Sequence, residues 1–132
     1  MSTIFSDLPV TIFEVMSQLA RDHDAINLGQ GFPEAPGPED IRRKAADAVL
    51  NGYNQYPSMM GLPELRVAIA NHYAHWHGVT FDPMSEVMVT SGATEALAGA
   101  ILGLVGAGDE VVVFQPFYDA YVPLIRRAGG TV

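Results

Sequence analysis

The spacing of hydrophobic residues predicts helices along most of the chain. In residues 11–22, hydrophobic side chains recur at the i, i+3, i+4 and i+7 positions that form one face of a helix. The same reasoning predicts further helices over residues 39–50, 62–77, 93–105 and 118–128. Glycines follow several of these segments, Gly78 and Gly129 among them, and glycine is a typical helix-ending residue.

Two of the predicted helices are expected to be buried in different ways. In residues 62–77 the apolar residues lie along one stripe, which we expect to face a core; they are Leu62, Leu65, Ile69, Tyr73 and Trp76. Residues 93–105 are apolar nearly all round, so we expect that whole helix to be buried.

Valine-rich segments between the helices predict strands. They cover residues 86–90 and 110–114. Helices and strands therefore alternate, which is typical of an α/β fold. Thr131 and Val132 are β-formers that follow a helix stop, where the next strand should begin. We therefore interpret the chain as truncated, with an incomplete sheet and apolar faces left exposed.

Composition excludes several classes of function. The chain has 132 residues, the length of one ordinary domain, and its 48% hydrophobic and 17% charged residues are typical of globular proteins. The net charge of −8 argues against a nucleic-acid partner. The longest apolar run is too short for a bilayer, and residues 1–10 have neither the basic region nor the apolar region of a secretory signal, so we expect no such signal and no membrane partner. Together with zero cysteines, this indicates a cytoplasmic protein.

The turn at residues 90–94 is a candidate phosphate site. It lies between a predicted strand and a predicted helix, and the first amide groups of a helix have no acceptor inside it. Gly92 and Ala93 leave the approach open, while Ser91 and Thr94 add hydroxyl donors. The alternative is an ordinary turn that uses small residues and a helix cap. The turn matches neither the dinucleotide-binding fingerprint nor the P-loop pattern.

Aromatic residues follow the second predicted strand, at the edge where open α/β sheets bind ligands. One ring in residues 114–121 could stack on a planar heterocycle, although core packing is the alternative. The loop 29–33 could cover a small-molecule site or simply turn a corner. Tyr53, Asn54 and Tyr56 lie in another loop, where their polar groups could reach an anion.

His72, His75 and His77 form the pattern H-x-x-H-x-H. No cysteine or suitably placed carboxylate completes a ligand set, so we predict exposed histidines and no metal site.

The order of four motifs is more specific than any one of them. The motifs are LGQGFP, YNQYPSMMGLPELRVAIA, VTSGATEAL and GDEVVVFQPFYDAY. In this order they resemble the N-terminal third of class I/II aminotransferases, which are fold-type I enzymes. The resemblance is strongest to the kynurenine, glutamine and methionine aminotransferase branch. It implies a partial pyridoxal-phosphate (PLP) transferase fold, an amino acid and a 2-oxo acid as substrates, and a homodimer.

The resemblance also implies roles for particular residues. Gly92, Ala93 and Thr94 match the turn that holds the phosphate of the cofactor, pyridoxal 5′-phosphate. Tyr118 matches the aromatic residue that stacks on the pyridine ring. Tyr56 matches the tyrosine that reaches the partner subunit's phosphate, and Gly31 matches the loop glycine near the substrate carboxylate.

The catalytic lysine of the family lies far downstream of these motifs. The single lysine here, Lys44, matches no catalytic position, so we assign no catalytic residue and expect the chain alone to be inactive. We predict that residues 1–40 form an N-terminal arm, small-domain segment and substrate loop, and that residues 41–132 begin the PLP-binding large domain. A PLP-dependent C–S lyase of the same fold and a non-catalytic gene remnant are the alternatives.

Overall fold

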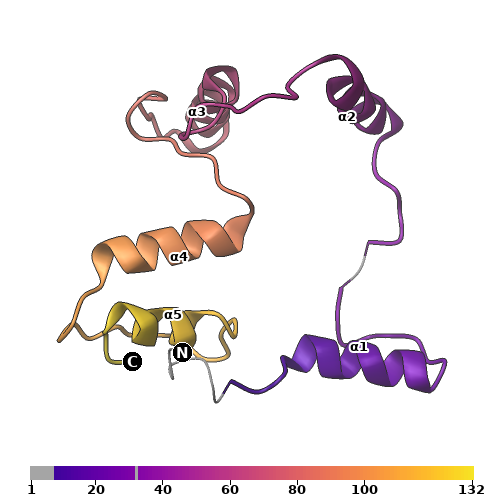
Figure 1. Ribbon diagram of the computed structural model, residues 1–132, viewed down its shortest axis with the longest axis vertical. Helices are drawn as coiled ribbons and strands as arrows, with labels where there is room; N and C mark the ends of the chain where they lie inside the picture. The colour runs from indigo at the N-terminus through magenta and orange to yellow at the C-terminus, as the bar shows by residue number, and fades with distance from the viewer. Residues whose placement is uncertain (1–7, 32) are drawn as a thin grey trace. The chain divides into compact units, whose positions relative to one another are not determined.

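A computed structural model describes residues 8–31 and 33–132. These residues contain five α-helices (Figure 1), which are α1 (Ile12–Asp22), α2 (Glu39–Asn51), α3 (Pro63–His77), α4 (Ala93–Leu104) and α5 (Tyr121–Ala128). All five predicted helices are therefore confirmed. The largest difference is at α5, which begins three residues later than predicted and leaves Tyr118 in the preceding loop.

Local signals account for where the helices begin and end. The Thr11 hydroxyl accepts a hydrogen bond from the Glu14 amide at 3.3 Å and caps the start of α1. At the other ends of α3 and α5, Gly78 and Gly129 adopt left-handed conformations with φ of 65° and 96°. Glycine has no Cβ to oppose this conformation, so both helices stop as the sequence predicts.

The chain forms two compact units. One contains residues 1–35 and 97–132, and the other contains residues 36–96. We call them the outer unit and the inner unit, after their places in the sequence. The candidate phosphate turn lies in the inner unit, together with α2 and α3.

The two predicted strands are not formed as strands among the described residues. Segment 86–90 has no strand assignment, and segment 110–114 contributes one parallel bridge, between Glu110 and Thr131. Around that bridge, the Val111 amide donates to the Thr131 carbonyl and the Thr131 amide donates to the Asp109 carbonyl, both at 2.8 Å. A strand needs a neighbour along its length, and here the backbone pairing is limited to this point. The bridge agrees with the expectation that a strand begins at Thr131.

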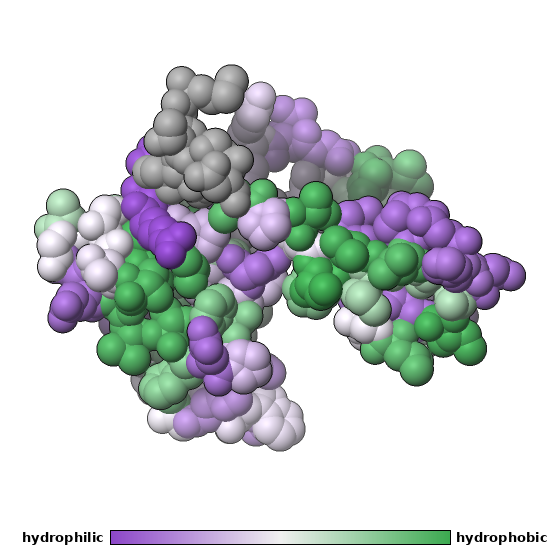
Figure 2. Space-filling view, turned by 90° about the horizontal axis from the view of Figure 1, so that it is seen from below, coloured by the Kyte–Doolittle hydropathy of each residue, from purple (hydrophilic) through white to green (hydrophobic). Residues whose placement is uncertain are grey.

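Few side chains of the described residues are buried. The buried apolar residues are Ala70, Val87 and Ile125, and no residue of α4 is buried. The prediction that the helix at 93–105 is buried is therefore wrong for this chain. Figure 2 shows hydrophobic side chains on the surface of the face in view. Burial requires partner elements as well as apolar residues, and the described residues supply too few partners.

The predicted apolar stripe of α3 is also not the buried side of that helix. Leu65 is 44% exposed and Trp76 is 69% exposed, whereas Arg66 and Ala70 are buried. Arg66 and Ala70 are four residues apart and therefore share a helical face. Within the inner unit the contact side of α3 is rotated from the predicted stripe. The expectation of exposed apolar faces is confirmed.

Candidate functional site

The candidate phosphate turn is a tight, open turn directly before α4. Gly92 has φ of +86°, a conformation that favours glycine, and a Cβ built there would meet nothing within 4 Å. The Thr90 hydroxyl donates to the Gly92 carbonyl at 3.0 Å, and the Gly92 amide donates to the Thr90 carbonyl at 2.9 Å. These bonds hold the backbone so that space remains in front of the helix.

The start of α4 has the properties of an anion site. Ser91, Gly92, Ala93 and Thr94 are all exposed, and the first amides of a helix carry a partial positive charge. The Glu95 carboxylate already accepts a hydrogen bond from the Ser91 amide. This contact shows that the turn can donate to a negatively charged oxygen. It also means that a phosphate would meet a carboxylate at the edge of the same site.

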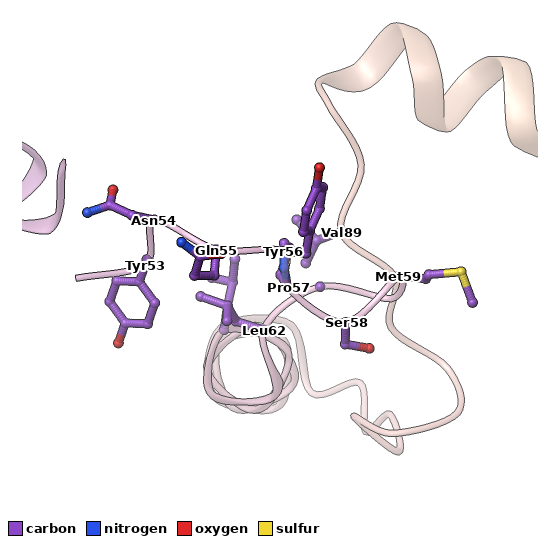
Figure 3. A pocket seen from close by; sticks show the side chains of 11 residues that line it. Tyr53, Asn54, Gln55, Tyr56, Pro57, Ser58, Met59, Leu62 and Val89 are labelled. Atoms are coloured by element: carbon purple, nitrogen blue, oxygen red, sulfur yellow. The ribbon is translucent and has the colours of Figure 1, made fainter.

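Tyr56 lies in an open groove of about 660 Å³ in the inner unit (Figure 3). The groove is lined by loop residues 53–59 and by Gly61, Leu62, Leu65 and Val89. The Tyr56 side chain is fully exposed, with 100% of its surface accessible. Such a side chain has no packing role within the described part of its own chain and is available to a ligand or a partner.

The loop that carries Tyr56 is attached to the segment that leads into the phosphate turn. The Val89 amide donates to the Met60 carbonyl at 3.0 Å. Tyr56 and Gly92, Ala93 and Thr94 therefore belong to one compact unit, so the structure brings these predicted residues into a common framework.

The other two predicted site residues lie in the outer unit. Tyr118 is 43% exposed, and its ring meets that of Tyr121 edge-on at a centroid distance of 5.9 Å. Gly31 is exposed, and the neighbouring Gln30 side chain accepts a hydrogen bond from the Ser17 hydroxyl of α1 at 3.1 Å. Phe32 of the same loop lies outside the described residues.

A second polar cluster of the inner unit lies at residues 82–85, before the segment that leads to the phosphate turn. The Asp82 carboxylate accepts hydrogen bonds from the Ser85 hydroxyl at 2.6 Å and the Met84 amide at 2.9 Å. These bonds, with a smaller contribution from the charge of Arg66, hold the pKa of Asp82 below its ordinary value. Arg66 is itself buried, and its Nε and Nη2 atoms have no hydrogen-bond partner in the structure.

Sequence reasoning missed Gly61, Arg66 and Glu95. The acidic residue in the first turn of the helix that starts at Ala93 could have revealed Glu95, because carboxylates favour helix N-termini. Gly61 and Arg66 carry no local signal, because their roles depend on residues distant in sequence. The histidines of α3 are exposed as predicted, and the described residues contain no cluster of three potential metal ligands.

Residues 23–132 match the family of class I and II aminotransferases. The chain belongs to this family. It is 50% identical over 119 residues to the probable N-succinyldiaminopimelate aminotransferase DapC of Mycobacterium tuberculosis, covering 90% of this chain and 30% of that protein. It is 49% identical over 125 residues to methionine aminotransferase of Escherichia coli. That match covers 95% of this chain and 32% of the relative. The predicted family is confirmed, and the predicted branch includes methionine aminotransferases.

A solved structure shows the same fold. The crystal structure of YbdL from Escherichia coli, described as having a methionine aminotransferase function, superposes with a TM-score of 0.92 at 46% sequence identity. The superposition covers 99% of this chain and 34% of that one. The predicted fold, part of a fold-type I transferase, is thereby confirmed. The chain spans about a third of the length of these relatives.

None of the helices that the structure describes is long and apolar enough to cross a bilayer.

Proposed function

We propose that this chain supplies the phosphate-binding part of a pyridoxal 5′-phosphate site in an enzyme that transfers an amino group from an amino acid to a 2-oxo acid. The observation that carries the proposal is the open turn at Gly92 in a member of the aminotransferase family. When bound, this cofactor supplies an aldehyde and a ring that withdraws electrons from the substrate.

The residues at the start of α4 fit a phosphate group. The Ala93 and Thr94 amides and the Thr94 hydroxyl would donate to its oxygens. The Gly92 amide, which donates to the Thr90 carbonyl in this structure, would join them on releasing that carbonyl. A Cβ built at Gly92 would meet no atom beyond its chain neighbours within 4 Å, so a group can approach the backbone there. The Ser91 amide, which donates to the Glu95 carboxylate, would then either donate to both the carboxylate and the phosphate or leave the carboxylate.

The remaining assignments orient the cofactor and the substrate. The exposed ring of Tyr118 would stack on the pyridine ring, and Gly31 would leave the substrate carboxylate room to approach the loop. The fully exposed Tyr56 would donate its hydroxyl to the phosphate of the partner subunit in a homodimer. Lys44, the single lysine, lies exposed on α2, and we assign it no catalytic role.

A chimera tests the proposal. The 132-residue chain is placed before the remainder of the Escherichia coli methionine aminotransferase, in place of the matching segment of that enzyme. We expect the chimera to bind pyridoxal 5′-phosphate and to transfer amino groups, and the chain alone to be inactive.

The matched control is the same chimera with Gly92→Val. A branched side chain at φ of +86° strains the turn and fills the phosphate space, so we expect cofactor affinity to fall at least tenfold, an estimate of about 1.4 kcal/mol. Cofactor binding is followed by its visible absorbance. A parent chimera that folds but binds no cofactor, or a Gly92→Val chimera that binds equally well, would contradict the proposal.

A further inference from the structure

Gly61 and Val89 approach each other more closely than any other residue type at position 61 would allow. A Cβ built at Gly61 would lie 2.6 Å from the Val89 Cβ and 2.7 Å from its Cγ2, closer than real side chains come. Gly61 also has φ of +97°, which disfavours L side chains. Two independent features therefore require glycine here.

Backbone hydrogen bonds hold the same contact. The Gly61 amide donates to the Ser58 carbonyl at 2.8 Å, which closes the end of the Tyr56 loop. The Val89 amide donates to the Met60 carbonyl at 3.0 Å, which ties that loop to the segment before the phosphate turn. We call the contact of Met60 and Gly61 with Val89 the 61–89 junction.

The 61–89 junction lies between two groups to which the proposed function assigns phosphate contacts. Tyr56 precedes Gly61 by five residues, and Gly92 follows Val89 by three. Figure 3 shows the Tyr56 and Val89 side chains in the same groove, and both residues line it. A displacement at the junction is therefore transmitted to both groups over short, hydrogen-bonded stretches of backbone.

We propose that Gly61 is a positioning residue of the cofactor phosphate site: it sets the register between the Tyr56 loop and the turn at Gly92 by direct contact with Val89. This inference rests on the proposed function. Because Tyr56 is proposed to serve the partner subunit's site and Gly92 the chain's own site, the junction couples the phosphate contacts of the two sites in a dimer.

The test compares four versions of the chimera. Gly61→Ala adds the methyl group that would collide with Val89, and Gly61→Ala with Val89→Gly removes the atoms it would collide with. Gly78→Ala is the matched control, because Gly78 also has a positive φ, of 65°, but has nothing within 4 Å of its built Cβ. The parent chimera is the reference.

Pyridoxal 5′-phosphate affinity and the ³¹P NMR shift of the bound cofactor are measured for each version. For Gly61→Ala we expect the affinity to fall about tenfold, since a small misplacement of binding groups has large effects, and the ³¹P signal to move. We expect the double variant to recover part of the affinity and part of the ³¹P shift, because the collision with Val89 is removed while the strain of a side chain at φ of +97° remains. Gly78→Ala should lower the melting temperature without moving the ³¹P signal.

Each outcome decides the question. Unchanged affinity and ³¹P shift in Gly61→Ala would overturn the inference while leaving the proposed function intact. A folded double variant whose affinity and ³¹P shift equal those of Gly61→Ala would also overturn it, because removing the Val89 atoms would then have changed nothing. A folded parent chimera that binds no cofactor would instead overturn the proposed function, and the inference with it.

Discussion

At the scale of single residues, Gly92 and Glu95 have opposite effects on an anion at the start of α4. Gly92 leaves open space in front of the helix. The Glu95 carboxylate accepts a hydrogen bond from the Ser91 amide and so brings a negative charge to the same place. The first turn of a helix stabilises a carboxylate, so the Glu95 contact with the Ser91 amide stabilises the turn. The same charge opposes a phosphate dianion.

Glu95→Gln is expected to increase the affinity of the chimera for pyridoxal 5′-phosphate. Two unit charges a few ångströms apart in water repel by roughly 1 kcal/mol, so removing the Glu95 charge from the edge of the site should raise the affinity about fivefold. The measurement is a cofactor titration at low and high salt, and the gain should shrink as salt screens the charges.

Glu64→Gln is the matched control for this prediction. Glu64 lies in the first turn of α3, as Glu95 does in α4, so the substitution removes the same charge from the first turn of another helix. Affinity should be unchanged there. A loss of affinity in Glu95→Gln would mean that the carboxylate organises the turn for the cofactor.

At the scale of elements, helices follow the sequence and strands do not. The start of α1 coincides with a threonine cap, and the ends of α3 and α5 coincide with left-handed glycines. These signals act through neighbouring residues. The predicted strands at 86–90 and 110–114 depend on partners elsewhere in the chain, and only Glu110 finds one, at Thr131. Burial also depends on partners elsewhere in the chain. Helix α4 has the apolar sequence of a buried helix, but it lacks the neighbours that would bury it.

The turn at residues 82–86, directly before Val87, is expected to make stability depend on pH. The Ser85 and Met84 hydrogen bonds lower the pKa of Asp82 in the folded chain from its ordinary value of 3.8. A carboxylate with a lowered pKa stabilises the fold above the ordinary value, and this contribution is lost as the pH falls through the folded pKa. Asp82→Asn should therefore destabilise the chimera near neutral pH, and the difference from the parent should shrink in acid.

Urea unfolding of the chimera from pH 7 to pH 2 measures this effect, because the contribution is lost below pH 3.8. Asp119→Asn serves as the control, because Asp119 is exposed and its carboxylate makes no hydrogen bond in the described part of the chain. A stability difference for Asp82→Asn that stays constant over the whole pH range would show that the carboxylate charge is not responsible.

At the scale of the whole molecule, the chain exposes apolar surface that a complete member of its family would be expected to cover. Large hydrophobic side chains such as Leu28, Leu104 and Phe114 are 83–90% exposed. The chain also spans about a third of its relatives' length. Contiguous exposed apolar surface promotes association.

The isolated chain is therefore expected to self-associate and to bind a hydrophobic dye. The chimera should form no assembly larger than a dimer and should not bind the dye. Sedimentation velocity over a range of concentrations, with dye fluorescence in parallel, provides the measurement. An isolated chain that remains monomeric and binds no dye would contradict this expectation.

Much of the candidate site could be predicted from the sequence, because its parts are local. The turn at residues 90–94 combines small residues, hydroxyls and a helix start within a short stretch, and the order of the motifs predicted the family. The roles assigned to Gly92, Ala93, Thr94, Tyr56, Tyr118 and Gly31 stay predictions, as does the division at residue 40. They concern groups whose partners lie in other parts of a folded enzyme.

The sequence by itself determined the five helices, the glycines that end them and the family, since these depend on spacing and on neighbours along the chain. Only the tertiary structure decided that Arg66 and Ala70, rather than the apolar stripe, are the buried residues of α3. Only it revealed the contact of Gly61 with Val89, which joins residues twenty-eight positions apart. Hydrophobic periodicity shows which face of a helix is apolar, but contact and burial depend on what the rest of the chain places against that face.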